Sequence, residues 1–303
     1  MRTLLAGWFS FEQMGATAGD LMTRDLARQW LEDAGHQVDV ALAPPFEGGV
    51  SWNTVDPQQY EQIVFVCGPL GNGWPVYEFF DRFQHARKVG LNVSMLQPLE
   101  DWNPFDLLLE RDSSRTSNAE LAFLSNEPKI PVVGLVLVHP QKEYADPKHE
   151  AAHAAIDRLL SAANVSTVPI DTRLDDNTTG WRNAAQVESL IAKTDVVVTT
   201  RLHGTVLALK NGVPALVIDP IAGGAKIRRQ CATIGWPLVF DADELDDAKL
   251  AEAFAYCLTK AARIAARACA ARATAMAEGV RDRFREDARH AENSQKKTRT
   301  EAR

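Results

Sequence analysis

Two residues that could act on an anionic substrate, Arg201 and His203, stand two positions apart in one short motif. The motif follows an apolar run typical of a buried β-strand (Asp195–Thr199) and precedes a helical segment (Val206–Lys210). In an open α/β sheet, ligands bind at the carboxyl ends of strands, and a helix N-terminus there favours an anion. Arginine grips carboxylate or phosphate groups with two hydrogen bonds, and histidine exchanges a proton near neutral pH. With Gly204 letting a ligand approach the backbone, the motif predicts an anion site with acid–base chemistry.

The same motif also has a structural interpretation. Arg201 could form a structural ion pair, and His203 could cap the following helix. An isolated Arg-x-His sequence would favour that interpretation. The succession of apolar strand, motif, glycine and helix favours a functional site instead.

A second cationic loop follows the next predicted strand, Ala215–Ile218. It contains Gly223 and Gly224, which free the backbone to approach a ligand, and Lys226 in the first turn of the next helix. Because the helix dipole disfavours a cation there, Lys226 indicates an anionic partner. The alternative is a solvated surface lysine, the usual location of this residue type. Since the two loops follow successive strands, we expect the Arg201 and Lys226 loops to line one cleft.

Weaker candidates lie earlier in the chain. Arg111 follows an apolar run and either reaches into the cleft or pairs with Asp112 at the surface. Gly19 and Asp20 open the first predicted helix, where Asp20 either caps the helix or faces a substrate. Asn72 lies in a glycine-rich loop after a predicted strand and is a candidate for contacts to a second substrate, the acceptor.

Strand and helix signals alternate along most of the chain. In the first half we expect strands at Thr3–Ala6, Val38–Leu42, Ile63–Cys67 and Asn92–Leu96, and helices at Gly19–Ala34 and Pro75–Val89. In the second half we expect strands at Val132–Val138, Val165–Ile170, Asp195–Thr199 and Pro214–Ile218, and helices at His149–Ala162, Ala184–Ala192 and Ala225–Ile234. Such alternation predicts parallel sheets covered by helices. The expected fold class is α/β, with two Rossmann-like domains that face a cleft, as in the GT-B glycosyltransferase fold.

The predicted domain boundaries follow from these series. The N-terminal domain comprises residues 1–125 and the C-terminal domain residues 126–245, with the polar stretch Asp112–Lys129 as the linker region. Residues 246–290 are rich in alanine and arginine, so we expect a helical segment that packs across the domains. Residues 291–303 contain no apolar residue except alanine, and we expect a disordered tail there.

The composition is that of an ordinary soluble globular protein: the 303 residues are 46% hydrophobic and 24% charged. A net charge of −7 argues against a nucleic-acid partner. The four cysteines lack metal-ligand spacing, so neither a metal site nor a disulfide framework is expected. No apolar run reaches the roughly 18 residues of a membrane span. The N-terminus is typical of a first strand and not of a signal peptide, so we expect a cytoplasmic enzyme, with a homo-oligomer left open.

The segment Thr199–Thr205, with Asn211–Pro214 and Gly223–Lys226, resembles the polysaccharide pyruvyl transferase family, whose hallmark is Arg-Leu-His-Gly after a strand and a downstream lysine. The stretch ending at Gly19-Asp20 resembles the family's N-terminal loop, and Arg111-Asp112-Ser113 resembles its mid-chain Arg-Asp motif. The resemblance is strong over residues 188–237 and loose elsewhere. It implies transfer of the enolpyruvyl unit of phosphoenolpyruvate to a sugar, which forms a ketal.

The resemblance also implies roles for the candidate residues. Arg201 and Arg111 would hold the carboxylate and phosphate of the donor, and Lys226 would neutralise the departing phosphate. His203 would act as general acid or general base. The glycines of the two donor loops, Gly204, Gly223 and Gly224, would approach the donor, and Gly19, Asp20 and Asn72 would serve the acceptor side. Phosphoenolpyruvate is then a co-substrate, no cofactor or metal is expected, and the acceptor is a sugar, a glycan or a lipid-linked sugar.

Two alternatives remain open. A GT-B glycosyltransferase that uses a nucleotide-sugar would share the architecture, with Glu188 or Asp219 as candidates for gripping the ribose. A non-catalytic member of the family could bind an anionic metabolite. Thr17-Ala18, at a place where the family commonly has an asparagine, favours this second alternative slightly.

Overall fold

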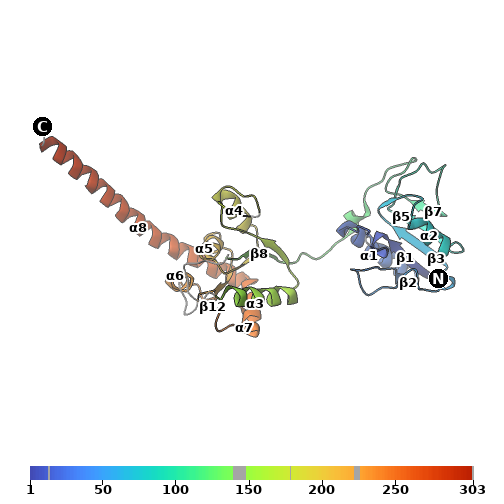
Figure 1. Cartoon of the computed structure of the whole chain (residues 1–303), viewed down its shortest axis with the longest axis horizontal. Helices are drawn as coiled ribbons and strands as arrows, with labels where there is room; N and C mark the ends of the chain where they lie inside the picture. The colour runs from blue at the N-terminus through green and yellow to red at the C-terminus, as the bar shows by residue number, and fades with distance from the viewer. Residues whose placement is uncertain (13, 139–147, 178, 222–225, 302–303) are drawn as a thin grey trace. The chain divides into compact units, whose positions relative to one another are not determined.

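A computed structural model describes residues 1–12, 14–138, 148–177, 179–221 and 226–301, with side chains described through residue 290. The chain divides into two compact units, Met1–Pro128 and Lys129–Arg303, which are described separately (Figure 1). In each unit the described residues form a five-stranded parallel sheet. The predicted α/β class with two Rossmann-like units is therefore confirmed.

The sheet of the first unit has the strand order β2-β1-β3-β5-β7. Its strands are β1 (Arg2–Gly7), β2 (Gln37–Val40), β3 (Gln62–Val66), β5 (Arg87–Leu91) and β7 (Leu107–Leu109), and β4 (Pro69–Leu70) pairs with β6 (Ser94–Met95). Its helices are α1 (Ala18–Asp33) and α2 (Val76–Arg82), with short 3-10 turns at Trp8–Ser10, Pro57–Gln59 and Leu121–Leu124.

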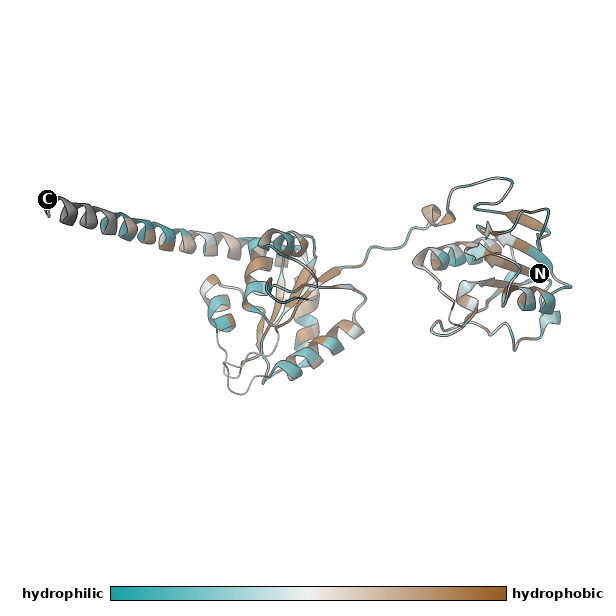
Figure 2. Ribbon diagram, turned by 45° about the horizontal axis from the view of Figure 1, so that its top comes forward, coloured by the Kyte–Doolittle hydropathy of each residue, from teal (hydrophilic) through white to brown (hydrophobic). Residues whose placement is uncertain are grey.

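The two faces of this sheet are covered by different helices. Leu4 and Ala6 of β1 pack in one buried cluster with Phe79 of α2, whereas Leu5 packs in another with Ala27 of α1. Successive side chains of a strand point to opposite faces, so a sheet buried on both sides needs a continuous apolar run. The apolar runs at residues 4–7 of β1 and 63–66 of β3 reflect this burial, and Figure 2 shows the strands largely in the hydrophobic colour.

Two predictions for the first unit are corrected. The expected helix Pro75–Val89 is shorter, since α2 ends at Arg82, and residues 87–91 form the additional strand β5 beside β3. Of the expected strand Asn92–Leu96, only the two residues of β6, Ser94–Met95, are in a strand. Parallel pairing with β3 overrides the helical pattern of the local sequence, as tertiary contacts commonly override propensity. Much of the expected linker also belongs to this unit, because the 3-10 turn Leu121–Leu124 packs against α1.

The sheet of the second unit has the order β12-β11-β10-β8-β9. Its strands are β8 (Val132–Val136), β9 (Ser166–Pro169), β10 (Val196–Thr199), β11 (Ala215–Asp219) and β12 (Val239–Asp241). Its helices are α3 (His149–Ala162), α4 (Ala184–Ile191), α5 (Leu202–Lys210), α6 (Lys226–Ile234), α7 (Asp247–Cys257) and α8 (Lys260–Glu301). The sequence pattern does not predict the edge strands β7 and β12, since three residues are too few to show a period.

Helices again cover both faces. Val197 of β10 packs with Ala208 of α5 and Ala266 of α8, whereas the adjacent Val198 packs with Ile156 of α3 and Phe254 of α7. The middle strand β10 is therefore buried on both sides, which fixes the position of the motif that follows it.

The C-terminal segment differs from its prediction. Residues 291–301, expected to be a disordered tail, continue α8 to Glu301. Most residues of this segment are good helix formers: alanine, arginine, lysine, glutamate and glutamine. A low content of apolar residues does not prevent such a segment from forming a helix. Among the helices of the described residues, none combines the length and the apolar character that crossing a membrane requires.

Candidate active site

The predicted motif begins directly after the central strand of the second unit. Arg201 is the N-cap of α5, with an extended backbone (φ −123°, ψ 136°). The Thr199 hydroxyl donates to the carbonyl of Val136 at 2.7 Å and accepts from the N–H of Arg201 at 2.9 Å, which fixes the turn. The first N–H groups of a helix have no intrahelical partner. In α5 the N-cap side chain of Arg201 does not accept from them either. These groups lie at the carboxyl end of β10, where they can attract an anion.

The guanidinium of Arg201 is held by a loop that follows β9. Its Nη1 donates to Asp171 Oδ1 at 2.8 Å and to Thr172 Oγ1 at 3.0 Å. The ion pair is largely buried, with side-chain exposures of 13% for Arg201 and 11% for Asp171. The structural interpretation of Arg201, an ion pair, is thus present, but the pair engages only one end of the guanidinium.

Asp171 was missed by sequence reasoning. The sequence does show that Asp171 follows a predicted strand, but this is only a weak signal of a site residue. The sequence does not show that β9 and β10 lie on either side of the same strand, β8. Sheet order brings the two carboxyl ends to one edge, so side chains 30 positions apart come into contact.

His203 lies in the first turn of α5 and is exposed. Among the described residues, none forms a hydrogen bond or an ion pair with its ring. The N-cap position belongs to Arg201, so His203 does not cap the helix. An exposed imidazole beside unpaired helix N–H groups can reach a bound substrate.

Gly204 has a packing role that the sequence did not suggest. It is buried, and a Cβ at this position would collide with Thr199 Oγ1 and lie 2.8 Å from Cγ1 of Val136. The glycine therefore allows the first turn of α5 to approach β8 and β10. The expected approach of a ligand to the Gly204 backbone stays a prediction.

The second donor loop is described only in part, since Gly223 and Gly224 lie outside the described residues. Lys226 is exposed and begins α6, which follows β11, the neighbour of β10 in the sheet. The loops that carry Arg201 and Lys226 therefore leave adjacent strands at the same edge of one sheet.

The two acidic residues considered for ribose binding are occupied. Asp219, fully buried at the end of β11, accepts hydrogen bonds from the N–H groups of Ile221 at 3.2 Å and Arg228 at 3.1 Å, which closes the start of α6. Glu188 pairs with Lys210 at 2.7 Å. Both carboxylates therefore have partners within the second unit.

In the first unit, Arg111 has an acceptor at each guanidinium nitrogen. Nε donates to Asp112 at 3.2 Å, Nη1 to Glu120 at 2.9 Å and Nη2 to the hydroxyl of Ser94. The hydrogen bond to Glu120 is the largest cause that raises the pKa of Arg111. Arg111 can bind a ligand anion only by giving up one of these partners. Arg111 belongs to the first unit, and Arg201 belongs to the second.

The other first-unit candidates lie at a helix start and in a loop. The Asp20 carboxylate accepts from the N–H of Thr17 at 2.6 Å and from its hydroxyl at 2.8 Å, so Asp20 completes a capping box for α1. Gly19 lies in the same helical turn, with its nearest contact for an added Cβ at 3.7 Å. Asn72 is exposed in the loop after β4. The capping interpretation of Asp20 is the one that these contacts support.

Two buried residues at the same edge of the first sheet adopt a left-handed backbone without being glycine. Cys67 follows β3 with φ 64°, and Asn92 follows β5 with φ 58°. The Asn92 amide donates to Cys67 Sγ at 3.4 Å and to Glu120, and its oxygen accepts from the N–H of Leu121 at 3.2 Å. Burial raises the pKa of the Cys67 thiol to about 11, so this thiol is not an activated nucleophile.

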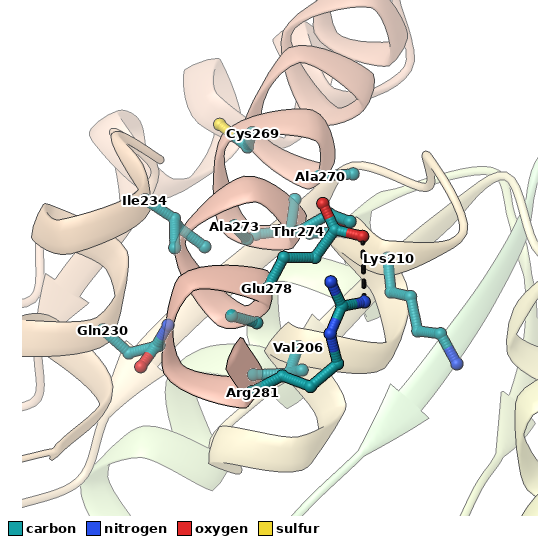
Figure 3. A pocket seen from close by; sticks show the side chains of 12 residues that line it. Val206, Lys210, Gln230, Ile234, Cys269, Ala270, Ala273, Thr274, Glu278 and Arg281 are labelled. Atoms are coloured by element: carbon teal, nitrogen blue, oxygen red, sulfur yellow. Dashed lines mark hydrogen bonds and ion pairs between the residues drawn. The ribbon is translucent and has the colours of Figure 1, made fainter. Parts of the chain in front are cut away.

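An apolar hollow of about 520 Å³ lies among α5, α6 and α8 (Figure 3). It is lined by residues such as Leu209, Ile234 and Ala273, and at its rim Glu278 pairs with Arg281 at 3.2 Å. None of the candidate site residues lines it. An apolar surface does not suit a small dianion, so this hollow is separate from the candidate active site.

Residues 122–220 match the family model of the polysaccharide pyruvyl transferases, which confirms the predicted resemblance over that span. No curated protein matches the chain. Among the solved structures that resemble it, three examples show a weak likeness. Spinosyn forosaminyltransferase SpnP is 15% identical, with a TM-score of 0.35, and the match covers 90% of this chain and 94% of that chain. The glycotransferase of kitacinnamycin is 11% identical, with a TM-score of 0.33 and coverage of 90% and 94%. UDP-GlcNAc 2-epimerase from Methanocaldococcus jannaschii is 8% identical, with a TM-score of 0.32 and coverage of 86% and 93%.

Proposed function

We propose that this protein transfers the enolpyruvyl unit of phosphoenolpyruvate to hydroxyl groups of a sugar-containing acceptor and forms a ketal. One observation carries the proposal. Within the span that matches the pyruvyl transferase family, Arg201 and His203 lie together at the start of α5, at the carboxyl end of the central strand. This places a cation, a proton-transfer group and helix N–H groups at one edge of the sheet.

The donor carries a carboxylate and a phosphate, so its site must supply several positive groups. Arg201 offers hydrogen-bond donors beyond those that Asp171 uses. The N–H groups of the first turn of α5 add partial positive charge. Lys226 begins α6 on the adjacent strand connection and would neutralise charge on the departing phosphate. Gly223 and Gly224 would let the backbone approach the same group.

The reaction needs one protonation and two attacks by oxygen. A proton is added to the methylene carbon, which becomes a methyl group and leaves an oxocarbenium-like carbon. A sugar hydroxyl attacks that carbon and loses its proton. A second hydroxyl then displaces inorganic phosphate, also losing its proton, and closes the ketal. His203 would supply the first proton as general acid or accept a hydroxyl proton as general base.

The acceptor side is proposed for the first unit, where Gly19, Asp20 and Asn72 lie. The acceptor class is a sugar, a glycan or a lipid-linked sugar, and we propose a cytoplasmic location for the reaction. Arg111 already holds three protein partners, so its contacts favour a role in shaping the first unit over a direct contact to the donor.

The proposal is tested in two steps. A thermal-shift comparison of phosphoenolpyruvate, UDP and GDP identifies the donor, and stabilisation by phosphoenolpyruvate alone is the expected result. Release of inorganic phosphate from phosphoenolpyruvate is then measured with a panel of sugar acceptors. Stabilisation by a nucleoside diphosphate instead would replace the proposal with a glycosyltransferase. Binding of phosphoenolpyruvate without phosphate release for any acceptor would indicate a non-catalytic anion-binding protein.

A further inference from the structure

The guanidinium of Arg201 has two nitrogens that the protein leaves to a ligand. Only Nη1 donates within the described residues, to Asp171 and Thr172. Nε and Nη2 have no acceptor among these residues, and neither is among the buried polar atoms that lack a partner. The Nε–Nη2 edge is therefore reachable by solvent. Arg111, by contrast, has an acceptor at all three nitrogens.

This edge has the geometry of a two-pronged anion clamp. Its two N–H groups point in parallel at a spacing that matches two oxygens of a carboxylate or phosphate group. A long arginine side chain usually samples many orientations, and a ligand must order it on binding. Here the opposite end of the guanidinium is already fixed by a charged partner, so the Nε–Nη2 edge is oriented before the ligand arrives.

Asp171 is itself held in place. It is 11% exposed, and its Oδ1 also accepts the N–H of Arg173 at 2.9 Å. β9 and β10 both pair with β8, and Asp171 and Arg201 each lie two residues beyond the end of their strand. The two side chains therefore meet over the end of β8, at one edge of the sheet.

We infer that Asp171 is a positioning residue that orients Arg201, so that the Nε–Nη2 edge of Arg201 binds an oxyanion of the donor through two oxygens. Asp171 acts through Arg201 and does not touch the donor. The inference rests on the proposed function only in taking an anionic donor as the ligand of this site.

A double-mutant cycle on the full chain tests the inference. Asp171→Ala, Arg201→Ala and the double variant are compared with the natural chain by calorimetric titration with phosphoenolpyruvate. Each single substitution is expected to weaken binding by about tenfold to a hundredfold, since a misplaced contact group costs that much. The double variant is expected to bind within about twofold of Arg201→Ala, because members of one interacting pair do not add. The inference would be overturned if Asp171→Ala bound phosphoenolpyruvate with natural affinity. It would also be overturned if Asp171→Ala weakened binding by the same factor in the natural chain and in the Arg201→Ala variant.

Two further variants separate positioning from general damage to the loop. Asp171→Asn keeps an oxygen acceptor for Nη1 of Arg201 and for the Arg173 N–H, so its affinity is expected to stay within about threefold of natural. Asp175→Ala is the matched control, because Asp175 pairs with the Arg173 side chain at 2.7 Å in the same loop. It is expected to bind normally. If Asp171→Asn lost as much affinity as Asp171→Ala, or if Asp175→Ala lost as much, positioning through this hydrogen bond would be refuted.

The same titrations distinguish this inference from the proposed function. Pyruvate and inorganic phosphate are titrated separately into the natural chain and into Arg201→Ala. The one whose affinity falls in Arg201→Ala shows whether Arg201 binds the carboxylate or the phosphate of the donor. If the natural chain binds UDP and not phosphoenolpyruvate, the proposed function fails. The double-mutant cycle is then measured with UDP as the ligand, and its result still decides the inference. If it binds none of these anions, both the proposed function and the inference fail.

Discussion

The Arg201 guanidinium and the Asp171 carboxylate form a largely buried ion pair of 2.8 Å that joins the start of α5 to the loop after β9. The pair leaves the Nε–Nη2 edge of Arg201 without a protein partner among the described residues. His203 follows Arg201 by two residues and is exposed in the first turn of α5. These relationships determine which substitutions should affect activity and which should affect stability.

His203→Ala should remove most turnover and leave the fold intact. A positioned acid or base typically contributes about 10²–10⁴-fold, and kcat should fall by that order. The exposed ring makes no hydrogen bond with the described residues, so the melting temperature should stay the same. Phosphate release is the measurement, with circular dichroism melting as the control. Normal turnover in His203→Ala would remove it from the mechanism.

Gly204→Ala should destabilise the second unit. The added Cβ meets Thr199 and Val136, and overpacking of this kind costs about 1–3 kcal/mol. Gly19→Ala is the matched control in the first turn of α1, where the nearest atom to an added Cβ is at 3.7 Å. This control should be neutral or should stabilise by about 0.4–1 kcal/mol. Urea unfolding measures both, and equal stability of the two variants would contradict the packing role of Gly204.

Arg111→Ala should act on stability more than on donor affinity. It removes the shared partner of Glu120 and Asp112 and should destabilise the first unit by about 1–3 kcal/mol. The dissociation constant for phosphoenolpyruvate should change little, in contrast to Arg201→Ala. Unfolding and calorimetric titration of both variants provide the comparison. A large loss of affinity with natural stability in Arg111→Ala would make this residue a donor ligand.

The buried cysteines should resist alkylation. Burial raises the pKa to about 11 for Cys67 and Cys231, and to about 12 for Cys257. With a pKa of about 11, only about one thiol in a thousand is ionised at pH 8. Iodoacetamide followed by mass spectrometry should label these residues only after urea is added. Rapid labelling of Cys67 in the folded protein would show that its side chain is reachable.

The same cysteines predict a loss of stability at alkaline pH. A thiol in the unfolded chain ionises near pH 8.5, below its raised value in the fold. The folded state therefore binds protons more tightly between these values. Stability from this source is complete below about pH 8.5 and is lost as the pH rises toward 11. Urea unfolding at pH 8 and pH 10 should show the decrease, and replacing Cys257 with alanine should reduce it.

Much of the architecture could be predicted from local pattern. The helix His149–Ala162 agrees with its predicted bounds, and the apolar runs at β1, β3, β8, β10 and β11 all form strands. Such predictions succeed where a period or an apolar run is long enough to show itself. Residues 87–89, which the pattern predicts to end a helix, belong to β5 instead, because their pairing with β3 depends on residues far away in the chain.

The sequence by itself determined that Arg201, His203 and Gly204 join a buried strand to a helix, because that arrangement depends only on neighbours in the chain. Only the tertiary structure decided what surrounds them. Strand order places the ends of β9 and β10 on either side of β8, so Asp171 reaches Arg201 and Gly204 packs on the sheet. Strand order follows from packing the whole unit, and no local pattern records it.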